Sequence, residues 1–587
     1  MKVSLRLVFF VVLALAALVG SVAAQDLQPA EGTLGPGEGA PIVEPNFGGD
    51  VATLNPILVS DGSSSDVVAR LFPGLIALDP DSGLPVKGGD GGMALDWAVS
   101  EDGLVYTFTL RSDWNWTDGN PVTATDFKYA FDAITSGEID SRISAAIANI
   151  ASVEAPDATT LVVTFNTPEC SALLTAQYVP FVPSVKYQEV YPTFADMTAD
   201  HPYNMAPEVT AGDFQFANFR PGEQVTLLAN QDYPDAQIGY VVPEGYVYKQ
   251  VADQLVGVEQ FLAGDVTFIE SIPDDRVAEL KALGDAGELI YGEGPSASWH
   301  YVIFNTADPA NPQNGLDDSG NPIEQGQHPI FGDVRVRRAF ALAVDHEALD
   351  AGAFAGLGTA IGSFLLPQSW AYNDAVAPWP YDLEQAAALL DAAGFVDDDN
   401  DPATPRVATE DALYAEPGTP LAFDMTSFSG NPTIDATVVL MQDQLSRVGF
   451  QMNLDIIEFQ TMIGKILSQN FDTTMLFIGP FDPNDPNGAY ELLDPSGDIV
   501  DAGLNIGSYY NDEFSSLMEE ARSLPGCDPV ARKALYDRAQ EIIREDLPIY
   551  IVTNSTVQYV AQPDLLNYDP RQSSLRWNIT MWSQVPR

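Results

Sequence analysis

Residues 104–131 have the sequence LVYTFTLRSDWNWTDGNPVTATDFKYAF, which places a strand, a turn and the start of a helix in one short run. Apolar and polar side chains alternate over residues 104–110, which predicts a strand with one buried face. The TDGN sequence at 117–120 is typical of a tight turn. Thr123 and Asp126 have the spacing of a capping box and predict a helix immediately after the turn. This stretch therefore indicates a fold of the mixed α/β class.

The same patterns predict further short elements on both sides of this stretch. Helices are expected at 334–354, 382–393 and 434–448, strands at 160–165, 451–457 and 471–478, and a β-hairpin over 211–230. Insertions that are acidic and rich in proline and glycine separate them, at 306–329, 397–419 and 480–503.

Composition and charge narrow the class of protein. The 587 residues are 46% hydrophobic and 10% aromatic, which indicates a folded chain that is too long for one core and divides into two or more lobes. Asp and Glu number 83 against 26 Lys and Arg, so the formal net charge is -57. This charge disfavours nucleic acid and anionic lipid as partners. An acidic surface also fits adaptation to a saline habitat, so the charge alone identifies no ligand.

The first residues predict export from the cytoplasm. Lys2 and Arg6 precede an unbroken apolar run at 7–19, and small residues follow, so a signal peptide cleaved after Ala24 is expected. No cysteine lies near this point to carry a lipid anchor. A flexible leader rich in glycine and proline is expected over residues 25–45. The expected location is the periplasm or the cell exterior.

The two cysteines, Cys170 and Cys527, are the whole complement of the chain. An even number of cysteines in an oxidising compartment predicts one disulfide between them. The alternative is two unrelated buried thiols.

Motifs for catalysis and for cofactors are missing from the sequence. The four histidines, His201, His300, His328 and His346, form no HExxH motif, so no metal site is predicted. Lys465 in the sequence IGKI lacks the remainder of a phosphate-binding loop, and there is no GxSxG motif. A pair of carboxylates of the glycosidase type stays open, because 83 acidic residues guarantee chance pairs.

One acidic cluster resembles the start of a calcium loop. Asp397, Asp399 and Asp401 stand at alternate positions, but Pro402 and Ala408 occupy the places of the loop's glycine and glutamate. A solvated loop is the preferred interpretation.

A series of short motifs runs along most of the chain in a fixed order. The motifs are LNP at 54–56, LFPGL at 71–75, WAVSEDG at 97–103, YTFTLR at 106–111, WTDG at 116–119, PVTATD at 121–126, FGDVRVRRAF at 331–340, YDLEQAA at 381–387, AGF at 393–395 and DLPI at 546–549. In this order they resemble the family 5 solute-binding proteins of ABC importers, a group that contains dipeptide-, oligopeptide- and nickel-binding proteins. The resemblance covers about residues 46–587.

The resemblance implies two α/β lobes joined by a hinge, which close around a ligand. Lobe 1 would comprise residues 46–57, 166–298 and 552–587, with an inserted subdomain at 58–165. Lobe 2 would comprise residues 299–551. The two crossings between the lobes would be hinge strands.

The resemblance also implies a position for the ligand's amino group. In the peptide-binding members, an aspartate in a loop after a strand neutralises the N-terminal ammonium of the peptide, and Asp482 matches that position, beside Phe481. A buried ammonium without a counter-charge would be costly. Ordinary turn chemistry explains the sequence DPNDP at 482–486 equally well. Gly479 stands where peptide binders often carry a tryptophan.

Aromatic residues are expected to line the same cleft. Phe459 falls where an aromatic residue commonly does so in the family, and Trp299, His300 and Tyr301 could form a stacking wall at the lobe crossing. Such a wall suits peptides and sugars equally. His300 fits a hydrogen-bonding pocket residue better than a metal ligand, although a nickel or haem ligand held by one histidine stays open.

Taken together, the residues and the resemblance to the family imply a non-enzymatic, monomeric, extracytoplasmic binding component of an ABC importer. Its expected partners are a peptide ligand and a permease in the membrane, with no cofactor and no nucleic acid. An oligosaccharide or a chelated metal is the alternative ligand. A secreted glycoside-active enzyme and a scaffold without a small ligand are the alternatives from other classes.

Overall fold

The computed structural model describes residues 28–47, 50–89, 91–251, 253–270, 272–317, 319–399, 401, 404–429, 431–478, 486–571 and 574–586. Among these residues, no helix combines the length and the apolar character needed to cross a bilayer.

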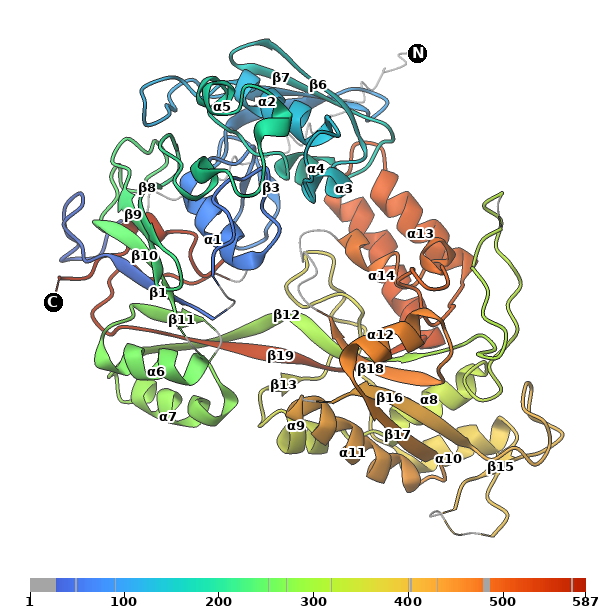
Figure 1. Ribbon diagram of the computed structural model, residues 1–587. Helices are drawn as coiled ribbons and strands as arrows, with labels where there is room; N and C mark the ends of the chain where they lie inside the picture. The colour runs from blue at the N-terminus through green and yellow to red at the C-terminus, as the bar shows by residue number, and fades with distance from the viewer. Residues whose placement is uncertain are drawn as a thin grey trace, which may run out of the picture.

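Two large hydrophobic cores divide the molecule into two lobes (Figure 1). The core of lobe 2 is built from residues between Trp299 and Val552. The core of lobe 1 contains residues between Ile42 and Tyr248, together with Phe268 and a C-terminal part that ends at Trp582. The C-terminal segment therefore returns to the lobe in which the chain begins.

Lobe 1 contains two four-stranded sheets and the helices around them. One sheet has the order β1 (Ile42–Asn46), β10 (Gly245–Gln250), β9 (Gln224–Ala229), β8 (Phe214–Arg220), and the other has the order β4 (Ala94–Val99), β5 (Val105–Leu110), β7 (Thr160–Phe165), β6 (Ile150–Asp157). The remaining elements are α1 (Gly62–Leu71), β2 (Ala77–Leu78), β3 (Pro85–Val86), α2 (Ala124–Thr135), α3 (Ile143–Ala146), α4 (Ala172–Gln177), α5 (Ser184–Val190), α6 (Gln254–Ala263), β11 (Phe268–Glu270) and α7 (Asp274–Asp285).

The start of lobe 1 corrects one prediction. Residues 25–45 were expected to form a flexible leader, but Ile42 begins β1, is fully buried and pairs with Tyr246. Before that strand, the backbone N–H groups of Gly37 and Gly39 donate hydrogen bonds to the carbonyls of Val241 and Val242, each at 2.9 Å. These two carbonyls lie shortly before the start of β10. Composition suggested a linker, but the apolar residues of β1 fill the edge of the sheet.

The predicted strand, turn and capped helix of residues 104–131 are confirmed as β5 and α2. The backbone N–H of Thr123 donates to the Asp126 carboxylate at 2.8 Å, which is one half of the capping box. Trp114 and Trp116, on the turn between the two elements, are both buried in the lobe-1 core. The turn therefore positions two large rings as well as reversing the chain.

Lobe 2 is built on a sheet that also receives strands from lobe 1. Its order is β11, β19 (Ile549–Ala561), β12 (Ile290–Phe304), β18 (Thr473–Ile478), β16 (Ala422–Phe428), β17 (Gln451–Ile457), and β13 (Gly358–Thr359) pairs with β19. The other elements are α8 (Val334–Ala343), α9 (His346–Ala353), α10 (Leu383–Ala392), β14 (Phe395–Val396), β15 (Val407–Ala408), α11 (Pro432–Ser446), α12 (Phe459–Leu467), α13 (Asp512–Ser523) and α14 (Pro529–Asp546).

The helix expected over 334–354 is two helices, α8 and α9. Val344 is extended, and the side chain of Asp345 accepts the N–H of Ala348 at 3.1 Å, which starts a new helix. The break was missed because the apolar pattern continues across it.

Strands β12 and β19, here called the connecting strands, span both lobes (Figure 1). They pair antiparallel from Ile290 and Ala561 in lobe 1 to Ile303 and Ile549 in lobe 2. Their register shifts between residues 295 and 299. A third, smaller core packs α6 and α7 against the lobe-1 ends of these strands.

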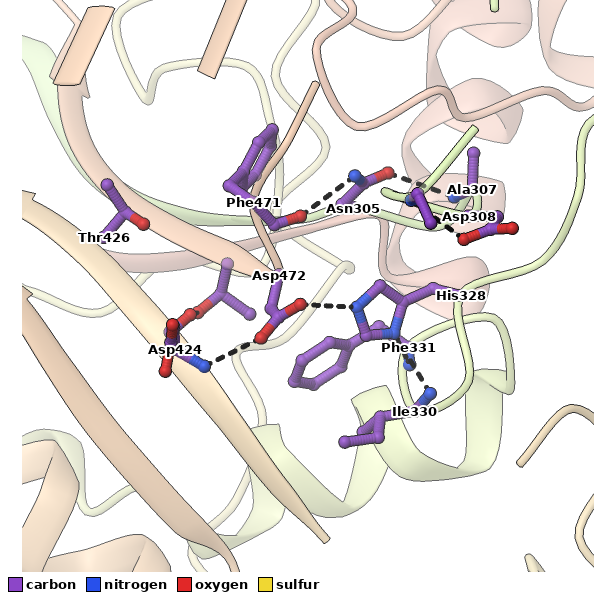
Figure 2. Close-up of polar contacts among 12 residues, drawn as sticks. Asn305, Ala307, Asp308, His328, Ile330, Phe331, Asp424, Thr426, Phe471 and Asp472 are labelled. Carbon is purple, nitrogen blue, oxygen red and sulfur yellow. Dashed lines mark hydrogen bonds and ion pairs between the residues drawn. The ribbon is translucent and has the colours of Figure 1, made fainter. Parts of the chain in front are cut away.

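The acidic insertion at 306–329 is fixed to the lobe-2 sheet by His328 (Figure 2). Its Nδ1 accepts the N–H groups of Ile330 and Phe331, each at 3.0 Å, so the ring proton lies on Nε2. Nε2 then donates to the Asp472 carboxylate at 3.1 Å, and Asp472 also accepts the N–H of Asp424. The histidine is only 2% exposed, and its contacts give it a structural role.

Candidate functional site

Three strands of the lobe-2 sheet end at the same edge. Strand β16 runs parallel to both β17 and β18, so the carboxyl ends of all three lie together. Phe428 ends β16, Phe459 begins α12 shortly after β17, and Phe477 is the penultimate residue of β18. Loops at the carboxyl ends of parallel strands are a common position for ligand sites in α/β proteins.

The rings at this edge form a continuous aromatic face. Phe428 contacts Phe459 and Phe477, with ring centroids 5.3 and 6.1 Å apart. His300 contacts Phe477 and Phe354, at 5.9 and 5.1 Å. These five residues, His300, Phe354, Phe428, Phe459 and Phe477, are called the aromatic face below.

Two rings of the aromatic face remain half-exposed. Phe459 is 42% exposed and Phe477 is 47% exposed. Phe428, which contacts both of these rings, and Phe354, which contacts His300, are buried. Large apolar side chains gathered at one point on a surface indicate a place where another molecule binds.

The predicted wall of Trp299, His300 and Tyr301 is wrong for two of its three members. Trp299 and Tyr301 are 0% and 3% exposed, and their rings meet edge to face inside the lobe-2 core, 4.5 Å apart. Consecutive side chains on a strand point to opposite faces, so only His300 points to the aromatic face. Period-two alternation in β12 could have revealed this from the sequence.

His300 is neutral under ordinary conditions. Burial lowers the pKa of its ring to about 4. Its Nδ1 lies 3.5 Å from the Ser555 hydroxyl on β19. A neutral imidazole between Phe354 and Phe477 supplies a flat ring with one polar edge.

Asp482 and Phe481 lie outside the described residues. The structure describes the chain up to residue 478, where β18 ends at the edge that carries the aromatic face, and again from residue 486. The roles expected for these two residues therefore stay predictions.

Two other positions that the sequence analysis considered, Lys465 and the calcium-like loop, make contacts within the protein. Lys465 lies in α12, where it pairs with Asp455 at 2.7 Å and donates to the Thr426 hydroxyl at 3.1 Å. In the calcium-like loop, the Asp399 carboxylate accepts from Thr404 and from the N–H of Asp401. The described part of the chain contains no group of three or more potential metal ligands.

The predicted disulfide between Cys170 and Cys527 is present, with 5.4 Å between the Cα atoms.

Phe354, Phe428 and Phe477 were not predicted as site residues. A signal existed for Phe477, because it lies near the end of a strand that the sequence predicts.

Comparison with known proteins finds a family and several distant relatives. The model of the bacterial extracellular solute-binding proteins, family 5, matches residues 90–499. The oligopeptide-binding protein AppA of Bacillus subtilis is 22% identical over 91% of this chain and 90% of its own length. A probable deoxycholate-binding periplasmic protein of Escherichia coli, YgiS, is 25% identical over 85% of each chain.

Solved structures of low sequence identity share the fold. The complex of B. subtilis AppA with a nonapeptide superposes with a TM-score of 0.65 at 20% identity, over 94% of this chain and 100% of AppA. HbpA2 of Haemophilus parasuis superposes with a TM-score of 0.73 at 18% identity, over 91% of this chain and 97% of its own.

Proposed function

Because the chain belongs to the bacterial extracellular solute-binding proteins of family 5, we propose that it captures peptides between its two lobes. It then delivers them to the permease of an ABC importer in the membrane. The role is one of binding without chemical conversion, carried out by a monomer outside the cytoplasm after cleavage behind Ala24. Relatives named as oligopeptide-binding proteins support the choice of ligand.

The aromatic face carries this proposal. Half-exposed rings at Phe459 and Phe477 offer apolar contact to side chains of varied shape, which suits a receptor that accepts many peptide sequences. The rings are held in place by buried neighbours, so little entropy is lost when a ligand covers them.

Asp482 supplies the counter-charge for the peptide's amino group in this proposal. Asp482 follows the end of β18 by four residues in the sequence, and β18 ends at the aromatic face. An ammonium removed from water requires such a partner.

The test compares two matched variants by titration calorimetry. Asp482→Asn should weaken the binding of free-amine peptides by at least tenfold, as expected for loss of a buried ion pair, and should change the binding of N-acetylated peptides little. Asp485→Asn makes the same chemical change three residues further along the sequence and should leave both affinities unchanged. Equal losses for free-amine and acetylated peptides would contradict the role of Asp482.

The ligand class is tested separately by native mass spectrometry of the freshly purified protein. A series of peptide masses released on unfolding supports the proposal. Release of an oligosaccharide or a metal chelate would contradict the peptide assignment and keep the receptor role.

A further inference from the structure

The disulfide joins the two lobes at a second place. Cys170 lies between β7 and α4, and Ala176 on α4 belongs to the lobe-1 core. Cys527 lies between α13 and α14, and Met518 and Tyr536 on these helices belong to the lobe-2 core. The bond therefore links one folded core to the other.

This junction lies away from the connecting strands. In Figure 1 the helices α13 and α14 lie beside α3 and α4 in the upper part of the molecule, whereas β12 and β19 cross between the lobes further down, near the middle of the view. The two segments of the chain lie close together at the junction, because the N–H of Cys170 donates to the carbonyl of Arg522 at 2.6 Å.

The backbone around Cys527 is shaped for this contact. Gly526 and Cys527 have φ values of 79° and 49°, both in the left-handed region. Glycine adopts this region freely, but a residue with a Cβ does so at a cost. The turn after α13 therefore holds Cys527 in a conformation that its side chain alone does not favour.

A bond at this place restricts motion between the lobes. Bridged cysteines keep their Cα atoms within about 4.4–6.8 Å of each other. If the lobes opened by bending at the connecting strands, the parts of the two lobes that lie away from these strands would move apart. The disulfide joins two such parts. With both attachments intact, the lobes can rotate only about a line through them or by local distortion of the two loops.

We propose that the Cys170–Cys527 disulfide is a covalent clasp that limits how far the two lobes open. Ligand exchange in the bridged protein then proceeds by small movements around two fixed points, and removing the bond releases a wider opening. This proposal concerns the motion of the lobes and does not depend on which ligand they take.

The test measures the size of the ligand-free mature protein by small-angle X-ray scattering. The oxidised wild type should have a radius of gyration near the ~25 Å of a compact chain of this length. The Cys170→Ser/Cys527→Ser variant should be larger by roughly 1–2 Å, as for an opened two-lobed protein. Ser171→Ala, next to the bond, keeps the disulfide and should scatter like the wild type.

Reduction of the wild type provides a second measurement on the unmutated chain. A dithiol reductant transfers two electrons and two protons to the bond, giving two thiols and its own cyclic disulfide. The reduced protein should expand as the variant does and contract on reoxidation. Hydrogen exchange should rise in residues 166–171 and 522–528 while the cores of both lobes stay protected.

Equal scattering of the oxidised, reduced and variant proteins, with thiol titration showing that reduction was complete, would overturn the proposal. Global unfolding of both the reduced protein and the variant, seen by near-ultraviolet circular dichroism, would also overturn it. The bond would then be a requirement for folding and not a limit on motion.

Discussion

At the scale of single residues, Phe459 offers the most direct test of the aromatic face. Replacing Phe459 by alanine removes a half-exposed ring and should weaken peptide binding by about 1–2 kcal/mol, or roughly 5- to 30-fold in Kd. Tyr381→Ala is the matched control, because Tyr381 is an aromatic residue of lobe 2 with 41% exposure outside this face. Calorimetric Kd values that change equally in both variants would show that the face does not bind the peptide.

His300 gives a second prediction, on the pH dependence of stability. Burial lowers the folded-state pKa of His300 to about 4, below the ordinary value of 6.5. As the pH falls between these values, the unfolded chain takes up a proton that the folded protein refuses, so stability is lost. The loss from this residue reaches at most about 3 kcal/mol.

Replacing His300 by phenylalanine keeps a flat ring between Phe354 and Phe477 and removes the titration. Urea unfolding at two pH values, one above 7 and one near 5, should show a smaller loss of stability for His300→Phe than for the wild type. Phe459→Leu, which changes the aromatic face without removing a titratable group, is the control and should keep the wild-type slope. An unchanged slope in His300→Phe would refute the assignment.

The site residues also show where sequence reasoning succeeds and fails. Phe459 and His300 both belong to the aromatic face. Phe459 was predicted from the resemblance to a family, and His300 from its position on a strand expected to cross between the lobes. Trp299 and Tyr301 are the neighbours of His300 in sequence but lie on the opposite side of β12. Adjacency in a strand therefore selected one residue of the aromatic face together with two residues of the lobe-2 core.

At the scale of elements, Asn554 holds the connecting strands where their register shifts. Its amide donates to the carbonyls of Ser296 and Ser298, at 2.9 and 2.7 Å, and the side chain is buried. Asn554→Ala would leave these carbonyls without that donor and should destabilise the protein by about 1–3 kcal/mol. Denaturant unfolding measures the loss, and hydrogen exchange should rise locally in β12 and β19.

Asn453→Ala is a suitable comparison for Asn554→Ala. Asn453 lies on an exposed part of β17 and donates to Asp424 at 3.2 Å. Its replacement should cost much less, because water can satisfy an exposed partner. Similar losses in the two variants would argue against a special role for Asn554.

Several individual elements follow from sequence patterns alone. The bounds of β7 and β17 agree with the predicted residues, because alternation of apolar and polar residues is a local property. β1 was missed, because its five residues contain a proline and follow a stretch rich in glycine. Its place in the sheet depends on β10, about two hundred residues later in the chain, and no local pattern contains that contact.

At the scale of the whole molecule, the sequence predicted a bond between the cysteines but not that this bond joins the two lobes. Pairing followed from an even count, whereas the bridging of two lobes depends on contacts between residues 357 positions apart. The direction in which each lobe faces the other is likewise a product of packing. Chain length indicated two or more lobes in advance, and the resemblance to a family supplied the arrangement of two lobes joined by a hinge.

The net charge of -57 leads to the last prediction. Repulsion among so many carboxylates opposes the compact state, and dissolved salt screens it. Raising NaCl from about 0.02 M to 0.3 M should increase the unfolding temperature by roughly 3–8 °C. Most of the total stabilisation by salt should occur below about 0.3 M, because the screening length has already fallen to about 10 Å at 0.1 M.

The response at higher salt tests whether the acidic surface is an adaptation to a saline habitat. Simple screening predicts a plateau above about 0.5 M, where neighbouring surface charges are already shielded. Adaptation to a saline habitat predicts that stability and peptide binding continue to rise into the molar range. NaCl and KCl compared at equal concentration control for specific ion effects. An unfolding temperature that does not change with salt would mean that the charges are spaced widely enough for repulsion to be negligible.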